Sequence, residues 1–224
     1  DTVRRQRQMC IRDRFMTPAI KKYNGFIDKY IGDAVMALFP SSAEDAVLAA
    51  VEMNKQLAVY NSDEPTSGKD PVNMGVGIHI GQLVLGTIGR ELRMETTVIS
   101  DTVNASARLE NLNKTYKTNV LISGAVRDEL SPDIQSFCRL IDRTQVKGKV
   151  EFLDVYEVYL TDDEPLAEAK SKSKKVLTSI VDSYYLGDIK AAKKILGELE
   201  DDTKKDTVIS CLLYTSPSPR DRVQ

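Results

Sequence analysis

Lys29 and Asp33 are two of the charged residues that interrupt the apolar stretch of residues 26–39. Alternate side chains of a strand share one face, so Lys29 is predicted between Ile27 and Ile31 on a largely apolar surface. Its ammonium group needs an acceptor there, because burying an unpaired charge is costly. Asp33 follows a glycine at a predicted tight turn, where a carboxylate can reach a hard cation. Two alternatives stay open, an ordinary Gly-Asp turn and a lysine that protects an edge strand.

A second pair of polar side chains, Asn104 and Arg108, lies one helical turn apart. At i and i+4 both project from the same face of a helix. The amide suits the ring or hydroxyl groups of a sugar, and the guanidinium suits a phosphate. The alternative is a solvent-exposed polar face on which Arg108 pairs with Glu110 or Asp101.

A third polar group consists of Lys147 and Lys149 on either side of a glycine. Cations on such a turn can meet terminal phosphates or simply face water. His79, the single histidine, lies in a predicted strand between two isoleucines. For His79 a structural role is favoured over a catalytic one.

The hydrophobic pattern predicts the elements that position these residues. Helices are expected at residues 16–23, after a Ser41-x-x-Glu44 capping box, at 101–112 and at 125–130. Strand pairs are expected at residues 26–39, 73–88 and 137–160, with a single strand at 119–123. Helices that alternate with strand pairs indicate an α+β fold with an antiparallel-rich sheet.

The chain divides at the charged segment 161–173, which is predicted to be a linker. Residues 15–160 form one predicted domain. Residues 174–210 form two amphipathic helices hinged at Gly187-Asp188. This helical segment resembles the start of tetratricopeptide-like repeats, and a coiled linker helix is the alternative.

Both ends of the chain resemble translated sequencing-library adapters and are set aside. Residues 9–13 and 211–216 back-translate to DNA strings that are reverse complements where they overlap. We therefore expect residues 1–14 and 211–224 to be artefacts, and a longer parent protein to carry the remainder. The alternative is a natural basic arm and a Ser/Pro linker.

The composition excludes several classes of protein. The 31 basic and 33 acidic residues include seven arginines and three aspartates at the two ends, so 24 basic and 30 acidic residues remain, which speaks against nucleic-acid binding. Outside the ends Cys138 is the single cysteine, which excludes a disulfide framework and suits the cytoplasm. No apolar run reaches the roughly 18 residues that span a bilayer. An upstream membrane anchor in the parent protein stays open.

Four segments, taken together, resemble the universal class III adenylate and guanylate cyclases. Order and spacing agree over the whole predicted domain, and the segments are residues 25–34, 77–81, 97–110 and 146–149. The resemblance implies a ferredoxin-like cyclase homology domain. It also implies a lyase that converts ATP to 3′,5′-cyclic AMP and pyrophosphate for signal transduction.

The resemblance also assigns roles to individual residues. Asp33 would be one of two aspartates that hold a pair of Mg²⁺ or Mn²⁺ ions. Lys29 and Thr97 would read the purine, a pairing that resembles the bicarbonate-responsive adenylate cyclases, whereas guanylate-specific relatives use Glu and Cys. Asn104 would orient the ribose and Arg108 would stabilise charge on the α-phosphate. Lys147 would hold the terminal phosphates.

The expected partners follow from the same resemblance. ATP is the substrate, and the site forms across a homodimer to which one protomer gives Asp33 and the other gives the remaining groups. An upstream sensor or regulatory domain is expected in the parent protein.

The chain departs from the family pattern at three positions. The second metal aspartate is expected on a strand before residue 16, so we predict that the 224-residue chain is inactive as it stands. Gly75 stands where some relatives have a triphosphate-binding arginine, and Ser100 replaces a usual glycine. The alternatives are a degenerate cyclase that serves as a nucleotide-binding or dimerisation module, and a guanylate cyclase.

Overall fold

A computed structural model of the chain describes most of its residues and divides it into two compact units. Unit 1 consists of Asp1–Met74 and Ile80–Val103, and unit 2 of Gly75–His79 and Asn104–Gln224. The described residues are 12–63, 71–88, 95–99, 101–145, 152–199 and 206–214, and the side chains of residues 84–88 and 95–99 are outside the description.

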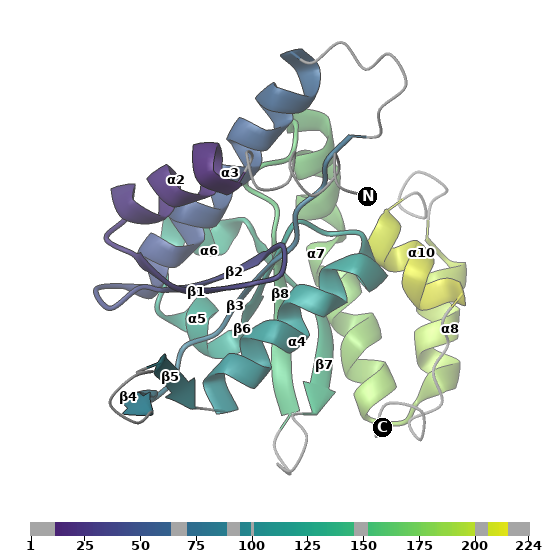
Figure 1. Cartoon of the computed structure of the whole chain (residues 1–224). Helices are drawn as coiled ribbons and strands as arrows, with labels where there is room; N and C mark the ends of the chain where they lie inside the picture. The colour runs from purple at the N-terminus through teal and green to yellow at the C-terminus, as the bar shows by residue number, and fades with distance from the viewer. Residues whose placement is uncertain are drawn as a thin grey trace. The chain divides into compact units, whose positions relative to one another are not determined.

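Unit 1 begins with helices that lead into a hairpin and a long helix (Figure 1). In chain order these are η1 (Arg12–Met16), α2 (Thr17–Lys22), β1 (Phe26–Ile31), β2 (Ala34–Leu38) and α3 (Ala43–Asp63). Asn24 ends the first helical segment with a left-handed backbone, φ 59°. The hydroxyl at the start of α3 belongs to Ser42, which accepts from the Glu44 amide at 3.0 Å. The sequence pattern had predicted Ser41 for this cap.

The predicted hairpin is confirmed, with one irregularity. β1 and β2 pair antiparallel around Gly32, whose φ of 64° suits the tight turn. The register shifts between Ile27 and Lys29, which pair with adjacent residues of β2. Adjacent positions point to opposite faces. Lys29 therefore shares a face with Ile31 but not with Ile27, contrary to the prediction.

The remaining strands of unit 1 correct the predicted pairing. β4 (Val84–Ile88) pairs antiparallel with β5 (Glu95–Ile99), and Gly86 lies opposite Thr97. The sequence pattern had paired residues 83–88 with residues 73–81 and had not predicted β5. That earlier strand, β3 (Val76–Ile78), belongs to unit 2.

Unit 2 is built on a four-stranded sheet in the order β3-β6-β8-β7. β3 runs parallel to β6 (Val120–Ser123), whereas β8 (Phe152–Val158) is antiparallel to both β6 and β7 (Cys138–Gln145). The predicted strand pair at residues 137–160 is confirmed. Helices and an antiparallel-rich sheet make this the expected α+β fold.

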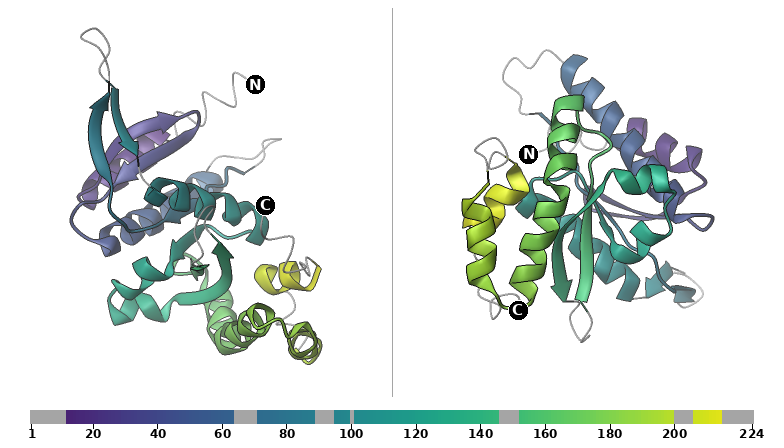
Figure 2. Two further views of the ribbon diagram at one scale, coloured as in Figure 1. Left: turned by 90° about the horizontal axis from the view of Figure 1, so that it is seen from below. Right: turned by 180° about the vertical axis from the view of Figure 1, so that it is seen from behind.

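The helices of unit 2 bury the core against this sheet. They are α4 (Asp101–Tyr116), α5 (Gly124–Asp128), α6 (Pro132–Ser136), α7 (Glu164–Tyr185), α8 (Ile189–Gly197) and α10 (Thr207–Tyr214). Both Figure 1 and the right-hand view of Figure 2 show α7 beside α8 and along β7. One apolar cluster joins α4, the sheet and the last three helices, through residues that include Leu109, Leu121, Ile141, Val155, Leu177, Leu196 and Ile209.

Two predicted boundaries fall inside helices. Residues 164–173 of the predicted linker form the first turns of α7, where Lys170 and Ser173 are buried. The hinge at Gly187-Asp188 is confirmed. α7 ends just before Gly187, whose backbone is left-handed at φ 78°, and α8 begins just after Asp188. α10 runs across the predicted boundary after residue 210, and Leu212 lies in the core. The assignment of residues 211–224 to an adapter stays a prediction.

Candidate active site

The ammonium group of Lys29 finds its acceptor in the neighbouring residue. Its Nζ lies 3.3 Å from Oδ2 of Asp28, whose side chain is only 4% exposed. Neighbouring side chains of a regular strand point to opposite faces, so this contact depends on the bulge in β1. Oδ2 of Asp28 makes no hydrogen bond, which makes the contact an ion pair alone. Lys29 is thus oriented by a buried carboxylate.

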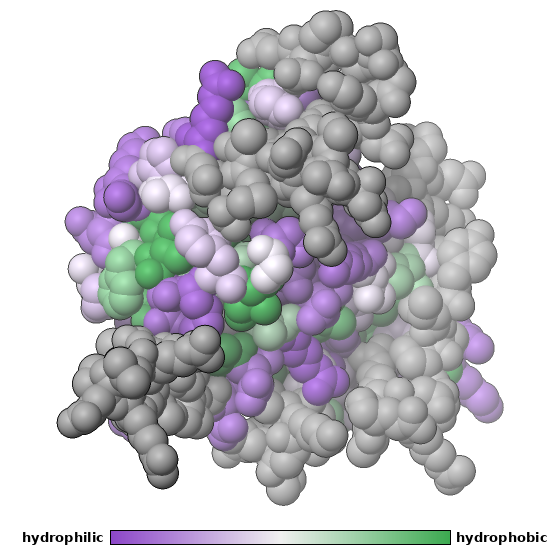
Figure 3. Space-filling model, in the orientation of Figure 1, coloured by the Kyte–Doolittle hydropathy of each residue, from purple (hydrophilic) through white to green (hydrophobic). Residues whose placement is uncertain are grey.

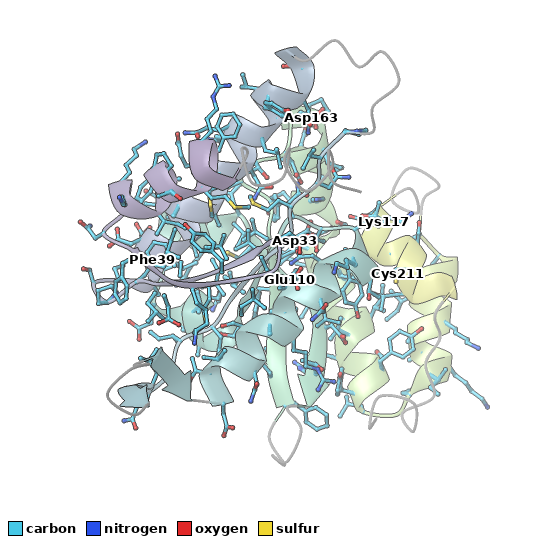
Figure 4. All side chains as sticks on the ribbon, viewed as in Figure 1. Asp33, Phe39, Glu110, Lys117, Asp163 and Cys211 are labelled. Atoms are coloured by element: carbon cyan, nitrogen blue, oxygen red, sulfur yellow. The ribbon has the colours of Figure 1, made fainter. Side chains whose placement is uncertain are left out.

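Asp33 lies at the tip of the β1–β2 hairpin (Figure 4). Its residue is exposed, and it follows the turn glycine directly. A single carboxylate on a turn can supply one ligand to Mg²⁺ or Mn²⁺, ions that keep several waters and bind phosphate oxygens as well. Among the described residues no group of three or more metal-ligating side chains gathers. Asp33 therefore fits a metal as one ligand of a shared site.

The same hairpin exposes large apolar side chains. Phe26, Tyr30 and Ile31 are 44%, 46% and 59% exposed. In the orientation of Figure 1, Figure 3 shows hydrophobic residues at the surface among hydrophilic ones. Phe26 and Ile31 share one face of the hairpin, since their partners Leu38 and Ala34 are four residues apart in β2, and exposed apolar side chains on one face are typical of a contact surface.

Asn104 and Arg108 project from one face of α4, as their spacing predicts. Asn104 is exposed and Arg108 is half-buried. Within the described part of the chain neither side chain makes a hydrogen bond or an ion pair. Glu110, one of the two alternative partners of Arg108 beside Asp101, lies 4.0 Å from Lys114 instead. The amide and the guanidinium are therefore available to a ligand.

Two contacts of β3 position α4 against the sheet. A Cβ on Gly77 would lie 2.3 Å from both Ser106 O and Glu110 N, so only glycine permits this approach. Asn113 then donates from Nδ2 to Val76 O at 3.0 Å. The helix face that carries Asn104 and Arg108 is consequently fixed relative to the strand.

A side chain at Gly75 would crowd α4. A Cβ at this position would lie 2.9 Å from Cβ of Asn113, an atom close to the backbone of α4. Asn113 is itself held by Thr118, whose Oγ1 donates to Oδ1 at 3.0 Å. Glycine at this position therefore suits the close approach of α4.

Two of the predicted site residues lie outside the described side chains. Thr97 is the middle residue of β5, but only its backbone is described. Lys147 falls between the end of β7 and the start of β8, outside the described residues. Their roles stay predictions.

His79 takes the structural role that was favoured for it. Its Nδ1 lies 2.8 Å from Oγ of Ser123, and the same Oγ caps α5 by accepting from the Val126 amide. His79 therefore contacts the residue that ends β6 and caps α5.

Asp28 is the partner of Lys29 that the sequence analysis missed. Its only signal was an acidic residue next to Lys29 in an apolar strand. Strict alternation places it on the opposite face, so the bulge had to be known first.

The family model described as the adenylate and guanylate cyclase catalytic domain matches residues 17–161. The chain belongs to this family. It is 43% identical over 149 residues to the adenylate cyclase of Anabaena cylindrica, covering 64% of this chain and 30% of that protein. It is also 41% identical over 152 residues to the terminal-differentiation-specific adenylate cyclase of Dictyostelium discoideum, covering 64% of this chain and 7% of that protein.

A solved structure of the family has the same fold. The crystal structure of the guanylyl cyclase Cya2 matches with a TM-score of 0.59 at 27% identity, covering 70% of this chain and 81% of that chain. The chain spans less than a third of either curated relative. No helix among the described residues is long and apolar enough to cross a membrane.

Proposed function

We propose that this cyclase domain acts on ATP and forms 3′,5′-cyclic AMP and pyrophosphate. The observation that carries the proposal is the pair Asn104 and Arg108 on one face of α4, which makes no hydrogen bond or ion pair within the described residues and lies inside the region that matches the family. An amide and a guanidinium one turn apart match a ribose and the phosphate attached to it.

The reaction is an in-line displacement at the α-phosphate. The ribose 3′-oxygen forms a bond to the α-phosphorus and loses its proton, while the bond to the β-phosphate oxygen breaks and pyrophosphate leaves. Asn104 orients the ribose, so that the 3′-oxygen faces the phosphorus. Arg108 stabilises the negative charge that grows on the phosphate oxygens, and Lys147 holds the terminal phosphates.

Base selection rests on Lys29 together with Thr97. Adenine N1 accepts a hydrogen bond from an ammonium group, whereas guanine N1 carries a hydrogen and repels it. Asp28 restricts the ammonium group to one direction through the 3.3 Å ion pair. A restricted donor loses less entropy when it binds the base.

Asp33 would hold the metal ions together with a second carboxylate. When bound, Mg²⁺ or Mn²⁺ would favour deprotonation of the 3′-hydroxyl and neutralise charge on the phosphates. The exposed apolar side chains of β1 fit a homodimer contact, which would place Asp33 of one protomer at the nucleotide of the other. A cytoplasmic site of action and an upstream regulatory domain belong to the same proposal.

The test compares two cation-removing changes on α4 in the parent protein. Arg108→Ala should lower kcat for cyclic AMP formation by about 10²- to 10³-fold, because it removes a donor to the developing charge. Lys114→Ala on the same helix removes an exposed cation whose partner among the described residues is Glu110, and it should leave kcat unchanged. Equal effects of the two changes, or an unaffected kcat in Arg108→Ala, would contradict the proposed role.

A further inference from the structure

A buried hydrogen bond ties the last turn of α4 to β7. The hydroxyl of Tyr116 donates to Oδ2 of Asp142 at 2.7 Å. Both residues are only 6% exposed, so water has little access to this bond. A hydrogen bond to a charged acceptor is stronger than one between neutral groups, and more so away from water. The end of α4 therefore has a fixed point on the sheet.

A bulge in β7 brings Asp142 to the face of the sheet that carries the core. The register of the β7–β8 pair shifts just before Asp142. Arg139 pairs with Glu157, and Asp142 pairs with Val155. These two partners lie two residues apart in β8, so all four side chains share one face. Uninterrupted alternation would have turned Asp142 to the face opposite Arg139. The bulge thus supplies a carboxylate to the cluster that contains Val155 and Tyr116.

A second helix contacts the same carboxylate. The hydroxyl of Tyr185 in α7 donates to Oδ1 of Asp142 in a longer bond of 3.5 Å. The two oxygens of Asp142 therefore accept from two different helices, α4 and α7. A carboxylate that is bonded through both oxygens has little freedom to rotate, and it restrains the Tyr116 hydroxyl in turn. α7 begins after residue 161, where the match to the family model ends.

Two separate contacts then determine the placement of α4 within unit 2. At the middle of the helix, the close approach to Gly77 sets its distance from β3. At its end, the bond of Tyr116 sets its rotation about its own axis, because the hydroxyl lies at the tip of a long side chain. Arg108 lies eight residues before Tyr116, which is about 12 Å along a helix. Since a helix of this length moves as one body, a rotation at Tyr116 also moves Arg108.

We propose that Tyr116 and Asp142 are positioning residues for the reaction: their hydrogen bond holds α4 in the rotation at which Arg108 acts on the α-phosphate. The proposal deepens the proposed function and rests on it, because Arg108 is the group through which the rate changes. A misplacement of about 1 Å can lower a rate by about 100-fold, so one hydroxyl at the far end of α4 can contribute a measurable factor to kcat.

The test compares the loss of two tyrosine hydroxyls in the parent protein. Tyr116→Phe removes the bond to Asp142 and keeps the ring in the core. It should lower kcat for cyclic AMP formation about 5- to 30-fold and change KM for ATP by less than about twofold, because Arg108 acts on charge that develops in the transition state. Tyr159→Phe is the matched control, since this buried tyrosine donates to Ser136 O of α6 at 3.1 Å. It should leave kcat and KM unchanged.

Two further comparisons separate positioning from a general loss of stability. In an Arg108→Ala background Tyr116→Phe should lower kcat no further, because the positioned group is already gone, whereas general damage would lower it by the same factor again. Asp142→Asn keeps an oxygen that can accept from Tyr116 and should retain most of kcat. Asp142→Ala should lower kcat as far as Tyr116→Phe does.

Amide hydrogen exchange in the 224-residue chain reports the restraint on α4 without any reaction. The amides of residues 109–116 should exchange faster in Tyr116→Phe than in the unchanged chain, because the last turns of α4 lose a contact with the sheet. Tyr159→Phe should leave their exchange unchanged.

The outcomes separate this proposal from the proposed function. If Arg108→Ala lowers kcat and Tyr116→Phe does not, the positioning role is overturned and the proposed function stands. Equal falls in kcat for Tyr116→Phe and Tyr159→Phe, a further fall in the Arg108→Ala background, or unchanged exchange of residues 109–116 would also overturn the positioning role. An unaffected kcat in Arg108→Ala would overturn the proposed function, and the positioning role with it.

Discussion

Replacement of Arg139 by methionine should strongly destabilise unit 2. Arg139 is fully buried on β7, where Nε donates to Glu157 at 2.6 Å and Nη1 donates to Asp206. Lys170 also donates to Glu157 and pairs with Asp162. Burial alone would lower the pKa of Arg139, but Glu157 and Asp206 raise it above its ordinary value.

The loss of unfolding free energy depends on the carboxylates that Arg139→Met leaves behind. Glu157 keeps Lys170 as a partner, whereas Asp206 is left in a largely buried place without a cation. Breaking a buried pair from one side costs about 3–5 kcal/mol of unfolding free energy. Asp206→Asn should cost less, because Arg139 keeps Glu157 and because asparagine still caps α10 through Val208 N.

Equilibrium unfolding in urea, followed by circular dichroism, measures both single variants and their combination. The double variant leaves no buried Asp206 carboxylate without Arg139. Its loss of unfolding free energy should therefore be smaller than the sum of the two single losses by about 1–3 kcal/mol. Arg127→Met is the control: Arg127 is 35% exposed and pairs with the more exposed Asp128, so its loss should cost at most about 1 kcal/mol. A cost of Arg139→Met as small as that of Arg127→Met, or strict additivity with Asp206→Asn, would refute the reasoning.

Three further predictions concern unit 2. Gly77→Ala should lower the urea concentration at which the chain unfolds. Its Cβ would lie 2.3 Å from backbone atoms of α4, and overpacking of this kind costs about 1–3 kcal/mol or more. An unchanged unfolding midpoint would contradict the close approach. Burial raises the pKa of the Cys138 thiol to about 11, so at pH 8 iodoacetamide should modify Cys211 first and Cys138 only after unfolding, as peptide mass spectrometry can show; equal rates would contradict this. Burial raises the pKa of Asp206, but the hydrogen bond and charge of Arg139, together with the Val208 amide and the charge of Lys170, lower it further, so the pKa lies below its ordinary value. The stability that Asp206 contributes should therefore be complete at neutral pH and vanish as the pH falls through its folded pKa. A stability difference from Asp206→Asn that grows toward acid pH would have the wrong sign.

Local pattern was sufficient for the elements whose partners are close in sequence. The β1–β2 hairpin and the β7–β8 pair were predicted, because turn residues and apolar runs lie side by side. β3 was assigned to the wrong partner, since its parallel neighbour β6 follows only after β4, β5 and α4. Periodicity reports which face of a strand is apolar and carries no information on a distant pairing.

The burial of charged side chains was the other feature that the hydrophobic pattern could not predict. The segment around Lys170 was interpreted as a linker because charged residues are mostly exposed. Its burial depends on Glu157 and Asp162, which reach it only in the folded sheet. The bulge that pairs Asp28 with Lys29 is likewise invisible to an alternating pattern.

The candidate site also has features that the sequence predicted and features that it could not predict. The identity of Asn104 and Arg108 and their common face followed from an i,i+4 spacing, and α4 bears this out. Their lack of partners among the described residues could not be predicted, because it depends on the folded positions of neighbours such as Glu110, which lies 4.0 Å from Lys114. The steric reason for Gly75 also required the position of Asn113.

The most direct test of the proposed function is a competition between ATP and GTP in one reaction of the parent protein with Mn²⁺. Cyclic AMP and cyclic GMP are then separated by chromatography. Cyclic AMP should dominate by at least about tenfold, and Lys29→Glu should reduce it strongly because the donor to adenine N1 is lost. Predominant cyclic GMP, or the absence of either product with nucleotide still bound, would contradict an adenylate cyclase.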